Sequence, residues 1–270
     1  MASFVLLDRP RPHVALVTLN RPERMNSMAF DVMVPLKAVL AELTHDNDVR
    51  AVVLTGAGRG FSSGADHKSA GSVPHVDGLT RPSFGLRSME LLDDVILGMR
   101  KLHQPVIAAV NGAAIGGGLC LALAADIRVA SSEAYFRAAG INNGLTASEL
   151  GLSYLLPRAI GSSRAFEIML TGRDVTAEEA ERIGLVSRQV APAELLDTCF
   201  DIAERIAAFS RPGTELTKRT LWSGLDAGSL ESHMQAEGLG QLYIRLLTSN
   251  FEEAVAARKE NRAAVFTDDK

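Results

Sequence analysis

Two glycine-rich segments contain residue types and spacings that could do chemistry. Residues 60–68 read GFSSGADHK, and residues 110–119 read VNGAAIGGGL, in which three glycines follow an apolar run and open a predicted helix. The first turn of a helix leaves backbone N–H groups without intrahelical partners, so an N-terminus free of side chains can bind a ligand oxygen. The second segment therefore predicts an anion-binding helix start, and a tight glycine turn is its purely structural alternative.

Two other motifs overlap the first segment and are weaker. A preceding glycine cluster, GAGRG, follows a strand-like run, but the third glycine of a dinucleotide-binding fingerprint would fall on Phe61, so the spacing fails. Residues 60–64 match the G-x-S-x-G nucleophile elbow of hydrolases, with Ser62 as nucleophile and Asp126 and His233 following in the required order. The polar residues that come next differ from the apolar helix that such an elbow needs. A serine hydrolase is therefore a remote alternative.

The elements that must position these segments are predicted by the hydrophobic pattern, which indicates an α/β core. Apolar, β-branched runs predict a hairpin followed by buried parallel strands, and apolar residues at helical spacing predict helices. The expected strands are residues 4–8, 14–19, 49–55, 105–110, 127–130 and 185–190. The expected helices are residues 29–46, starting near Pro35, 117–125, 163–171, 177–183, 193–209, 214–223, 229–248 and 250–261. Residues 69–82 are expected to form a loop, which at this length is often a binding element or a lid.

Composition and charge exclude several classes of protein. The 270 residues are 47% hydrophobic and 22% charged, as in soluble globular proteins with a sizeable core. The formal net charge of −4 offers no field for nucleic acid or anionic lipid. Cys120 and Cys199 lie in apolar runs, so we expect neither a disulfide framework nor a metal site. No run is long enough for a signal peptide or a membrane span, and we expect a protein of the reducing cytoplasm.

The two glycine-rich segments together resemble the signatures of the enoyl-CoA hydratase/isomerase (crotonase) family. The resemblance also includes residues 19–26 (LNRPERMN), 170–172 (LTG), 180–186 and 254–266, so it covers nearly the whole chain. It implies a crotonase-like ββα superhelix core in residues 1–200. It further implies a helical trimerisation region in residues 201–270 and a homotrimer or a hexamer made of two trimers.

The same resemblance implies which residues form the site. The backbone N–H groups of Ala65 and Gly117 would form an oxyanion hole for the thioester oxygen of an acyl-CoA, where donors stabilise the charge that develops in the transition state. Coenzyme A would enter as part of the substrate, with no metal or redox cofactor. It would contact the Arg24, Met25, Ser62, Gly64, Asp66, His67 and Lys68 positions. Arg24 and Lys68 are the expected phosphate partners, and ordinary solvated charges are the alternative.

The chain departs from the hydratase pattern at two positions. Cys120 and Gly140 stand where hydratases of the family carry two glutamates, and neither residue can do the acid–base work of water addition. Glu149 stands where isomerases of the family place a catalytic aspartate. Its structural alternative is an acidic residue in the first turn of the following helix. We therefore predict double-bond isomerisation through an enolate, with a non-catalytic acyl-CoA binding protein as the alternative.

Overall fold

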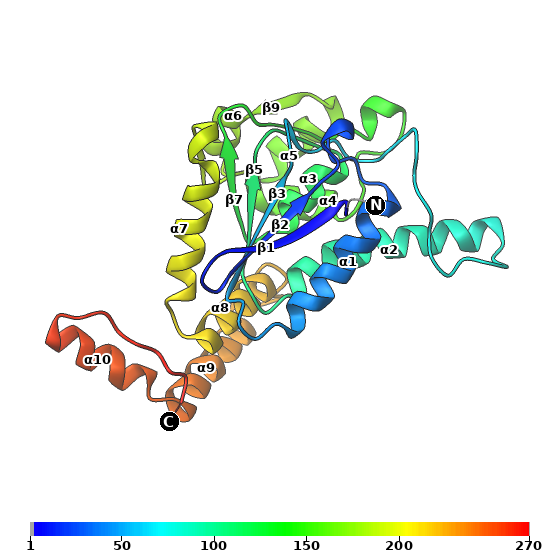
Figure 1. Ribbon diagram of the computed structural model, residues 1–270. Helices are drawn as coiled ribbons and strands as arrows, with labels where there is room; N and C mark the ends of the chain where they lie inside the picture. The colour runs from blue at the N-terminus through cyan, green and yellow to red at the C-terminus, as the bar shows by residue number, and fades with distance from the viewer. Residues whose placement is uncertain (1–2, 270) are drawn as a thin grey trace.

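The strand-like runs of the N-terminal half form a six-stranded sheet in the computed structural model, which describes residues 3–269 (Figure 1). The strands lie in the order β1-β2-β3-β5-β7-β10: β1 Val5–Arg11, β2 Val14–Leu19, β3 Ala51–Gly56, β5 Val106–Val110, β7 Ile127–Ser131 and β10 Arg188–Val190. β1 and β2 form the predicted antiparallel hairpin, and the other neighbours pair in parallel. Every residue of β3 and β5 is buried, which explains why these strands are apolar runs without alternation.

A second, four-stranded sheet joins the two glycine-rich segments, and the sequence pattern did not predict it. Its order is β4-β6-β8-β9: β4 Gly60–Ser62, β6 Ala113–Ile115, β8 Tyr135–Arg137 and β9 Asp174–Thr176. Strands of three residues are too short to display a period of two, so alternation gives no signal for them. β4 and β6 pair in parallel, with Gly60 opposite Ala113 and Ser62 opposite Ala114. The segment after β4 therefore lies beside the start of the helix that follows β6.

The helices predicted for the C-terminal third and the helix expected after Glu149 are present, and one helix, in residues 81–101, was not predicted. The α-helices are α1 Phe30–His45, α2 Arg81–Lys101, α3 Gly117–Ala124, α4 Leu152–Ile160, α5 Ser162–Thr171, α6 Ala177–Arg182, α7 Leu195–Ala207, α8 Arg211–Gly224, α9 Leu230–Leu247 and α10 Asn250–Glu260. Short 3₁₀ turns are η1 Pro22–Arg24, η2 Ile141–Asn143 and η3 Pro192–Glu194. α2 escaped prediction because its first half has no buried stripe, and Figure 1 shows this half extending away from the core.

Helix α1 begins ahead of Pro35, so the start predicted near that proline is wrong. Val32 and Met33 are buried in the core, and they can reach it together with Leu36 only if the helix is already formed before the proline. A proline inside a helix removes one backbone hydrogen bond. Burying a large apolar side chain contributes about 1.5–3 kcal/mol, so two of them offset that loss.

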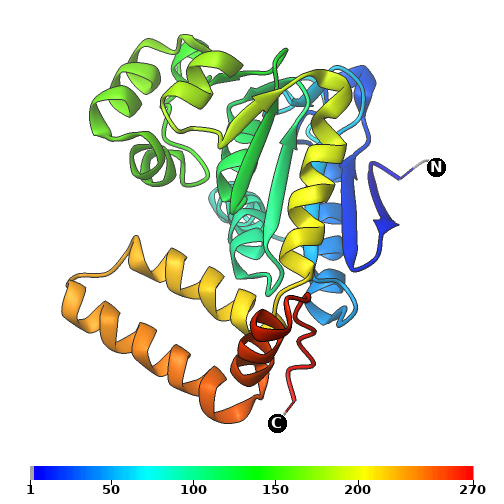
Figure 2. The same ribbon diagram turned by 90° about the vertical axis from the view of Figure 1, so that its left-hand side faces the viewer.

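The large sheet is covered on both faces. One face packs against a cluster that includes residues of α1, α3 and α4, and the other packs against α7 through Leu195, Cys199, Phe200 and Ala203. Figure 2 shows α7 running along this face. The domain boundary predicted between residues 200 and 201 falls inside α7, which packs against the sheet on both sides of that boundary. The change to the C-terminal helices comes after Ala207, where α7 ends.

Helices α8, α9 and α10 lie together beneath the core (Figure 2). α8 is tied to the core by Lys218, whose Nζ lies 2.9 Å from Asp126 Oδ2 and donates to Gln104 O at 2.9 Å. These helices leave many large apolar side chains exposed: Leu221, Leu225, Leu230, Met234, Leu239, Leu242, Tyr243, Leu246, Leu247 and Phe251. Within residues 3–269, no helix has both the length and the apolar character needed to cross a bilayer.

Candidate active site

The turn after β2 is locked onto the first glycine-rich segment by a buried asparagine. Asn26 Nδ2 donates to Ala57 O at 2.9 Å and to Gly60 O at 2.8 Å, and Asn26 Oδ1 accepts from Arg21 N at 2.8 Å. Met25 and Asn26 have left-handed backbone, with φ of 49° and 52°. Asparagine tolerates this conformation better than most residues. These hydrogen bonds hold the turn after β2 against the segment that leads into β4.

The Asp66 carboxylate is the polar centre of the loop after β4. Its side chain is 2% exposed and lies 2.8 Å from Arg21 Nη1 and 2.6 Å from Arg24 Nη2. Burial alone would raise the pKa of Asp66, but hydrogen bonds from the Lys68 and Ser69 amides and from Arg24 hold that pKa well below its usual range. The carboxylate is fully engaged in fixing the loop, so only the backbone of Asp66 is available to a ligand.

The segment that contains Ala65 lies against the start of α3. A Cβ added to Gly64 would stand 3.2 Å from Gly117 N and 2.5 Å from Ile115 O, so only glycine permits this approach. Gly117 is the first residue of α3, and its N–H has no partner within the helix. In the described part of the chain, no acceptor pairs with the N–H of Ala65. Two free backbone donors on adjacent segments can polarise a single carbonyl oxygen.

Met28, which no sequence motif indicated, contacts both donor segments. Its N–H donates to Gly64 O at 2.7 Å, and it forms an isolated parallel bridge with Ala65. A Cβ added to Gly117 would stand 2.3 Å from Met28 Sδ. No local motif signals this role, because the contacts join residues that are far apart in the chain.

The serine-hydrolase alternative is wrong. Ser62 is fully buried, and its hydroxyl donates to Asn26 O at 2.8 Å, so this side chain is unavailable either as a nucleophile or as a ligand contact. Asp126 is paired with Lys218 beneath α8, and His233 lies on α9 near Glu237. These residues do not assemble around Ser62.

Glu149 lies in the loop before α4 and points at the helix start. A Cβ added to Gly116 would stand 3.0 Å from Glu149 Oε1, and Gly116 directly precedes the donor Gly117. Burial raises the pKa of Glu149 above its usual range, and the charge of His67 opposes this rise. A carboxylate with a raised pKa beside the start of α3 is suited to moving a proton at a polarised substrate.

The helix-opening alternative for Glu149 does not hold. α4 begins at Leu152, its N-cap is Gly151, and its first turn contains no acidic residue. The Glu149 side chain therefore does not cap α4 or interact with its first turn. The carboxylate instead lies next to Gly116, at the start of α3.

The two predicted hydratase positions provide no acid–base group. Cys120 is fully buried in α3, and burial, followed by the negative charge of Glu149, raises the pKa of its thiol, which therefore stays protonated. A Cβ added to Gly140 would stand 1.9 Å from Thr146 O, a backbone atom. No side chain fits at position 140 without rebuilding the loop.

The remaining predicted contact residues lie on the turn after β2 and on the loop after β4, and together they form a rim. Ser63 N donates to Met25 O at 2.9 Å, which holds Met25 and its neighbour Arg24 against this loop. His67 and Lys68 are exposed on the loop, and Arg24 is partly exposed although it is paired with Asp66. The structure thus brings exposed basic side chains to one rim.

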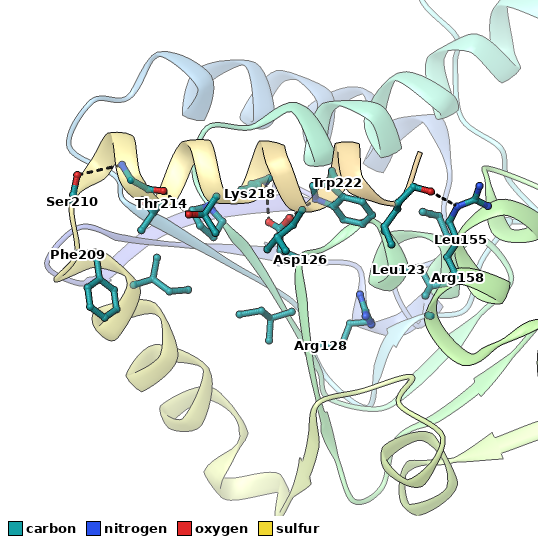
Figure 3. A pocket seen from close by; sticks show the side chains of 18 of the residues that line it. Leu123, Asp126, Arg128, Leu155, Arg158, Phe209, Ser210, Thr214, Lys218 and Trp222 are labelled. Carbon is teal, nitrogen blue, oxygen red and sulfur yellow. Dashed lines mark hydrogen bonds and ion pairs between the residues drawn. The ribbon is translucent and has the colours of Figure 1, made fainter. Parts of the chain in front are cut away.

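A cavity of about 760 Å³ lies away from these residues, beneath α8 (Figure 3). It is bounded by α8, the end of α7, the start of β7 and α4. Figure 3 shows Lys218 and Trp222 of α8 reaching Asp126 across its upper side. None of the residues predicted to bind or act on an acyl-CoA lines this cavity, and its lining is mainly apolar.

Comparisons with known proteins agree on one family. The model of the enoyl-CoA hydratase/isomerase family matches residues 10–269. The probable enoyl-CoA hydratase EchA12 of Mycobacterium tuberculosis (strain ATCC 25618 / H37Rv) is 82% identical over 267 residues, covering 99% of this chain and 94% of that protein. A probable enoyl-CoA hydratase/isomerase from Mycobacterium abscessus superposes with a TM-score of 0.95 at 74% identity, covering 99% of this chain and 100% of the other. A monofunctional enoyl-CoA isomerase from M. smegmatis superposes with a TM-score of 0.75 at 70% identity, covering 87% of this chain and 99% of the other.

Proposed function

Because this chain belongs to the enoyl-CoA hydratase/isomerase family and has the crotonase fold, we propose that it is an enoyl-CoA isomerase that uses Glu149 as its base. One observation carries the proposal. Glu149 Oε1 lies 3.0 Å from the point that a Cβ on Gly116 would occupy, next to the Gly117 donor. This places a titratable group beside the donors that would hold the thioester oxygen.

In the proposed reaction, the N–H groups of Ala65 and Gly117 bind the thioester oxygen of an enoyl-CoA whose double bond lies between C3 and C4. Glu149 removes a proton from C2, and the electron pair moves toward the thioester oxygen as an enolate, which the two donors stabilise. The protonated Glu149 then returns the proton to C4, and the double bond ends between C2 and C3. The proton and the electron pair balance without a further reactant.

Two observations favour isomerisation over hydration. Cys120 and Gly140 provide no carboxylate to hold and activate a water molecule, and backbone atoms already fill the space beside Gly140. The similar protein from M. smegmatis is described as a monofunctional isomerase, whereas other relatives are named hydratases. A site that has a carboxylate at Glu149 and none at Cys120 or Gly140 agrees better with isomerisation than with hydration.

We propose that coenzyme A lies along the rim formed by the turn after β2 and the loop after β4. The exposed Lys68 and His67 and the partly exposed Arg24 can meet its phosphates, while Met25 and the backbone of Gly64 and Asp66 border the path to the donors. The Asp66 side chain acts indirectly, because its ion pairs with Arg21 and Arg24 hold the rim in place. No metal or redox group takes part in the proposed steps.

The decisive experiment compares wild-type protein with Glu149→Gln on two substrates. A 3-enoyl-CoA should be converted to the 2-enoyl isomer by the wild type, and glutamine should lower this turnover at least ~100-fold, the low end of what positioned proton transfer contributes. Affinity for the substrate should be preserved, because glutamine keeps the size of the side chain. Hydration of crotonyl-CoA should be feeble in both proteins.

The possible outcomes separate the competing functions. Normal isomerisation by Glu149→Gln, or efficient hydration by the wild type, contradicts the proposal. Acyl-CoA binding without turnover of any unsaturated substrate favours a non-catalytic binding protein instead. Circular dichroism of both proteins shows whether a loss of turnover reflects chemistry or unfolding.

We also propose that the protein is a homotrimer or a hexamer assembled through α8 to α10. Apolar side chains such as Leu239, Leu242 and Phe251 are more than half exposed on these helices, and a second copy would remove them from water. A cytoplasmic location fits the two buried, unpaired cysteines, since reducing compartments keep thiols free.

A further inference from the structure

Cys120 joins the two segments that must cooperate in the proposed reaction. Its Sγ lies 3.3 Å from Gly116 O and 3.4 Å from Glu149 O, both within the range of sulfur hydrogen bonds. The Cys120 side chain is fully buried, so both contacts lie at the edge of the core. Because the thiol stays protonated, its single S–H can be shared between the two acceptors.

The two carbonyls belong to the segments that carry the candidate donor and the candidate base. Gly116 has φ of 53° and directly precedes the Gly117 donor, and Glu149 carries the candidate base. A left-handed glycine at this position turns the chain from β6 into α3. The thiol therefore contacts the backbone of the donor segment and the backbone of the base at once.

The loop that carries Glu149 is strained directly after it. Leu150 has φ of 45° and Gly151 has φ of 79°, and Glu149 O also accepts from Leu152 N at 2.7 Å. A bulky residue in the left-handed region costs about 1–3 kcal/mol and persists only where its surroundings hold it. Leu150 is buried over Gly117, with its Cδ1 3.4 Å from the Cβ position of that glycine.

We propose that Cys120 is a positioning residue for Glu149, whose thiol ties the backbone of the base to the segment that ends in the Gly117 donor. The inference rests on the proposed role of Glu149 as the base. Across the described residues 3–269, no hydrogen bond holds the Glu149 carboxylate itself, so its placement depends on the backbone that carries it. The titratable neighbours of the carboxylate are His67 on the loop after β4 and Cys120 on α3.

The test compares Cys120→Ala, Cys120→Ser and Cys199→Ala with the wild type, using isomerisation of a 3-enoyl-CoA. Alanine removes the donor and should lower kcat about tenfold with little change in KM, because misplacements well below 1 Å are costly to proton transfer. Serine keeps a hydroxyl donor and should restore most of the turnover. Cys199→Ala is the matched control, because this cysteine is equally buried but packs between α7 and the sheet.

A pH–rate profile distinguishes positioning from general packing. Loosening the loop in Cys120→Ala should expose the carboxylate and move the acid limb of kcat to lower pH, whereas Cys199→Ala should leave the limb in place. If Cys120→Ala does not fold, Cys120→Val fills the volume without a donor and must show the same loss of kcat.

Three results overturn the inference. The first is unchanged kcat and pH profile in a folded Cys120→Ala enzyme, while Glu149→Gln is inactive; the proposed function then survives and the role of the thiol does not. The second is an equal loss of kcat in Cys120→Ala and Cys199→Ala, which would indicate packing alone. The third is normal turnover by Glu149→Gln, which overturns the proposed function and the positioning role together.

Discussion

Adding a single methyl group at Gly117 should disturb the proposed oxyanion donor at the start of α3. The new Cβ in Gly117→Ala would stand 2.3 Å from Met28 Sδ and 3.1 Å from Met28 Cε. Ordinary van der Waals contact begins near 3.4 Å, so Met28 or the start of α3 must move by about 1 Å. The Met28 side chain is buried, so the core leaves its sulfur little room, and part of the displacement falls on the start of α3, which carries Gly117 N.

The expected magnitude follows from that displacement. A misplacement of about 1 Å can cost about 100-fold in rate, and losing one oxyanion donor costs about 100- to 1000-fold in other enzymes. We therefore expect Gly117→Ala to lower kcat/KM about 100-fold, which corresponds to about 2.7 kcal/mol of transition-state stabilisation. Gly117→Val should abolish measurable turnover. The overpacking should lower the free energy of unfolding by only about 1–3 kcal/mol, so a folded protein is expected.

The assay is steady-state isomerisation of a 3-enoyl-CoA, with folding checked by circular dichroism and acyl-CoA affinity measured separately. Gly228→Ala is the control, because a Cβ there meets nothing within 4 Å. The double variant Met28→Ala/Gly117→Ala removes the clashing sulfur and should recover part of the lost activity. Full activity and affinity in a folded Gly117→Ala or Gly117→Val enzyme would refute the assignment of this helix start.

The pKa of Glu149 is raised by burial, and the base must be ionised, so the acid limb of kcat/KM should lie above the ordinary pH range of a glutamate; a limb at or below pH 4.5 contradicts this. Asp66→Asn should lower the free energy of unfolding at neutral pH and make that free energy less sensitive to acid. The reason is that folding lowers the pKa of Asp66, so its carboxylate stabilises the folded protein above pH 3.8, and this stabilisation is lost as the pH falls toward the lowered pKa. Lys218→Ala should lower the free energy of unfolding in urea by about 1.5–3 kcal/mol, the range for a hydrogen bond to a charged group, because Asp126 loses its ammonium partner but keeps the donors Val106 N and Trp222 Nε1; an unchanged midpoint would show that the pair contributes nothing. Light scattering should give the mass of a trimer or a hexamer, and a stable monomer at micromolar concentration would count against the assembly.

Features that depend on neighbouring residues could be predicted from the sequence. The hairpin, the buried parallel strands and the C-terminal helices follow from runs and spacings within short windows, and all were found. The glycine triplet predicted a helix start with free backbone donors, and α3 begins at Gly117 as expected. The absence of glutamate at positions 120 and 140 can also be read directly from the chain.

Features that depend on contacts between distant residues were decided by the tertiary structure. The pairing of β4 with β6 brings Gly64 against Gly117, although strands of three residues carry no periodic signal. The sequence placed Asp66 among the coenzyme A contacts, but only the structure shows that its side chain is buried in ion pairs with Arg21 and Arg24.

Glu149 shows the limit of local patterns most clearly. In the sequence, Ser148-Glu149 has the composition of a helix start, and a helix does follow. In the structure, α4 begins only at Leu152, and the Glu149 carboxylate lies next to Gly116 across the chain. Helix starts and strands are governed by interactions between residues a few positions apart, which a sequence displays. The environment of a side chain, and with it the pKa of a carboxyl, is set by atoms that only folding brings within reach.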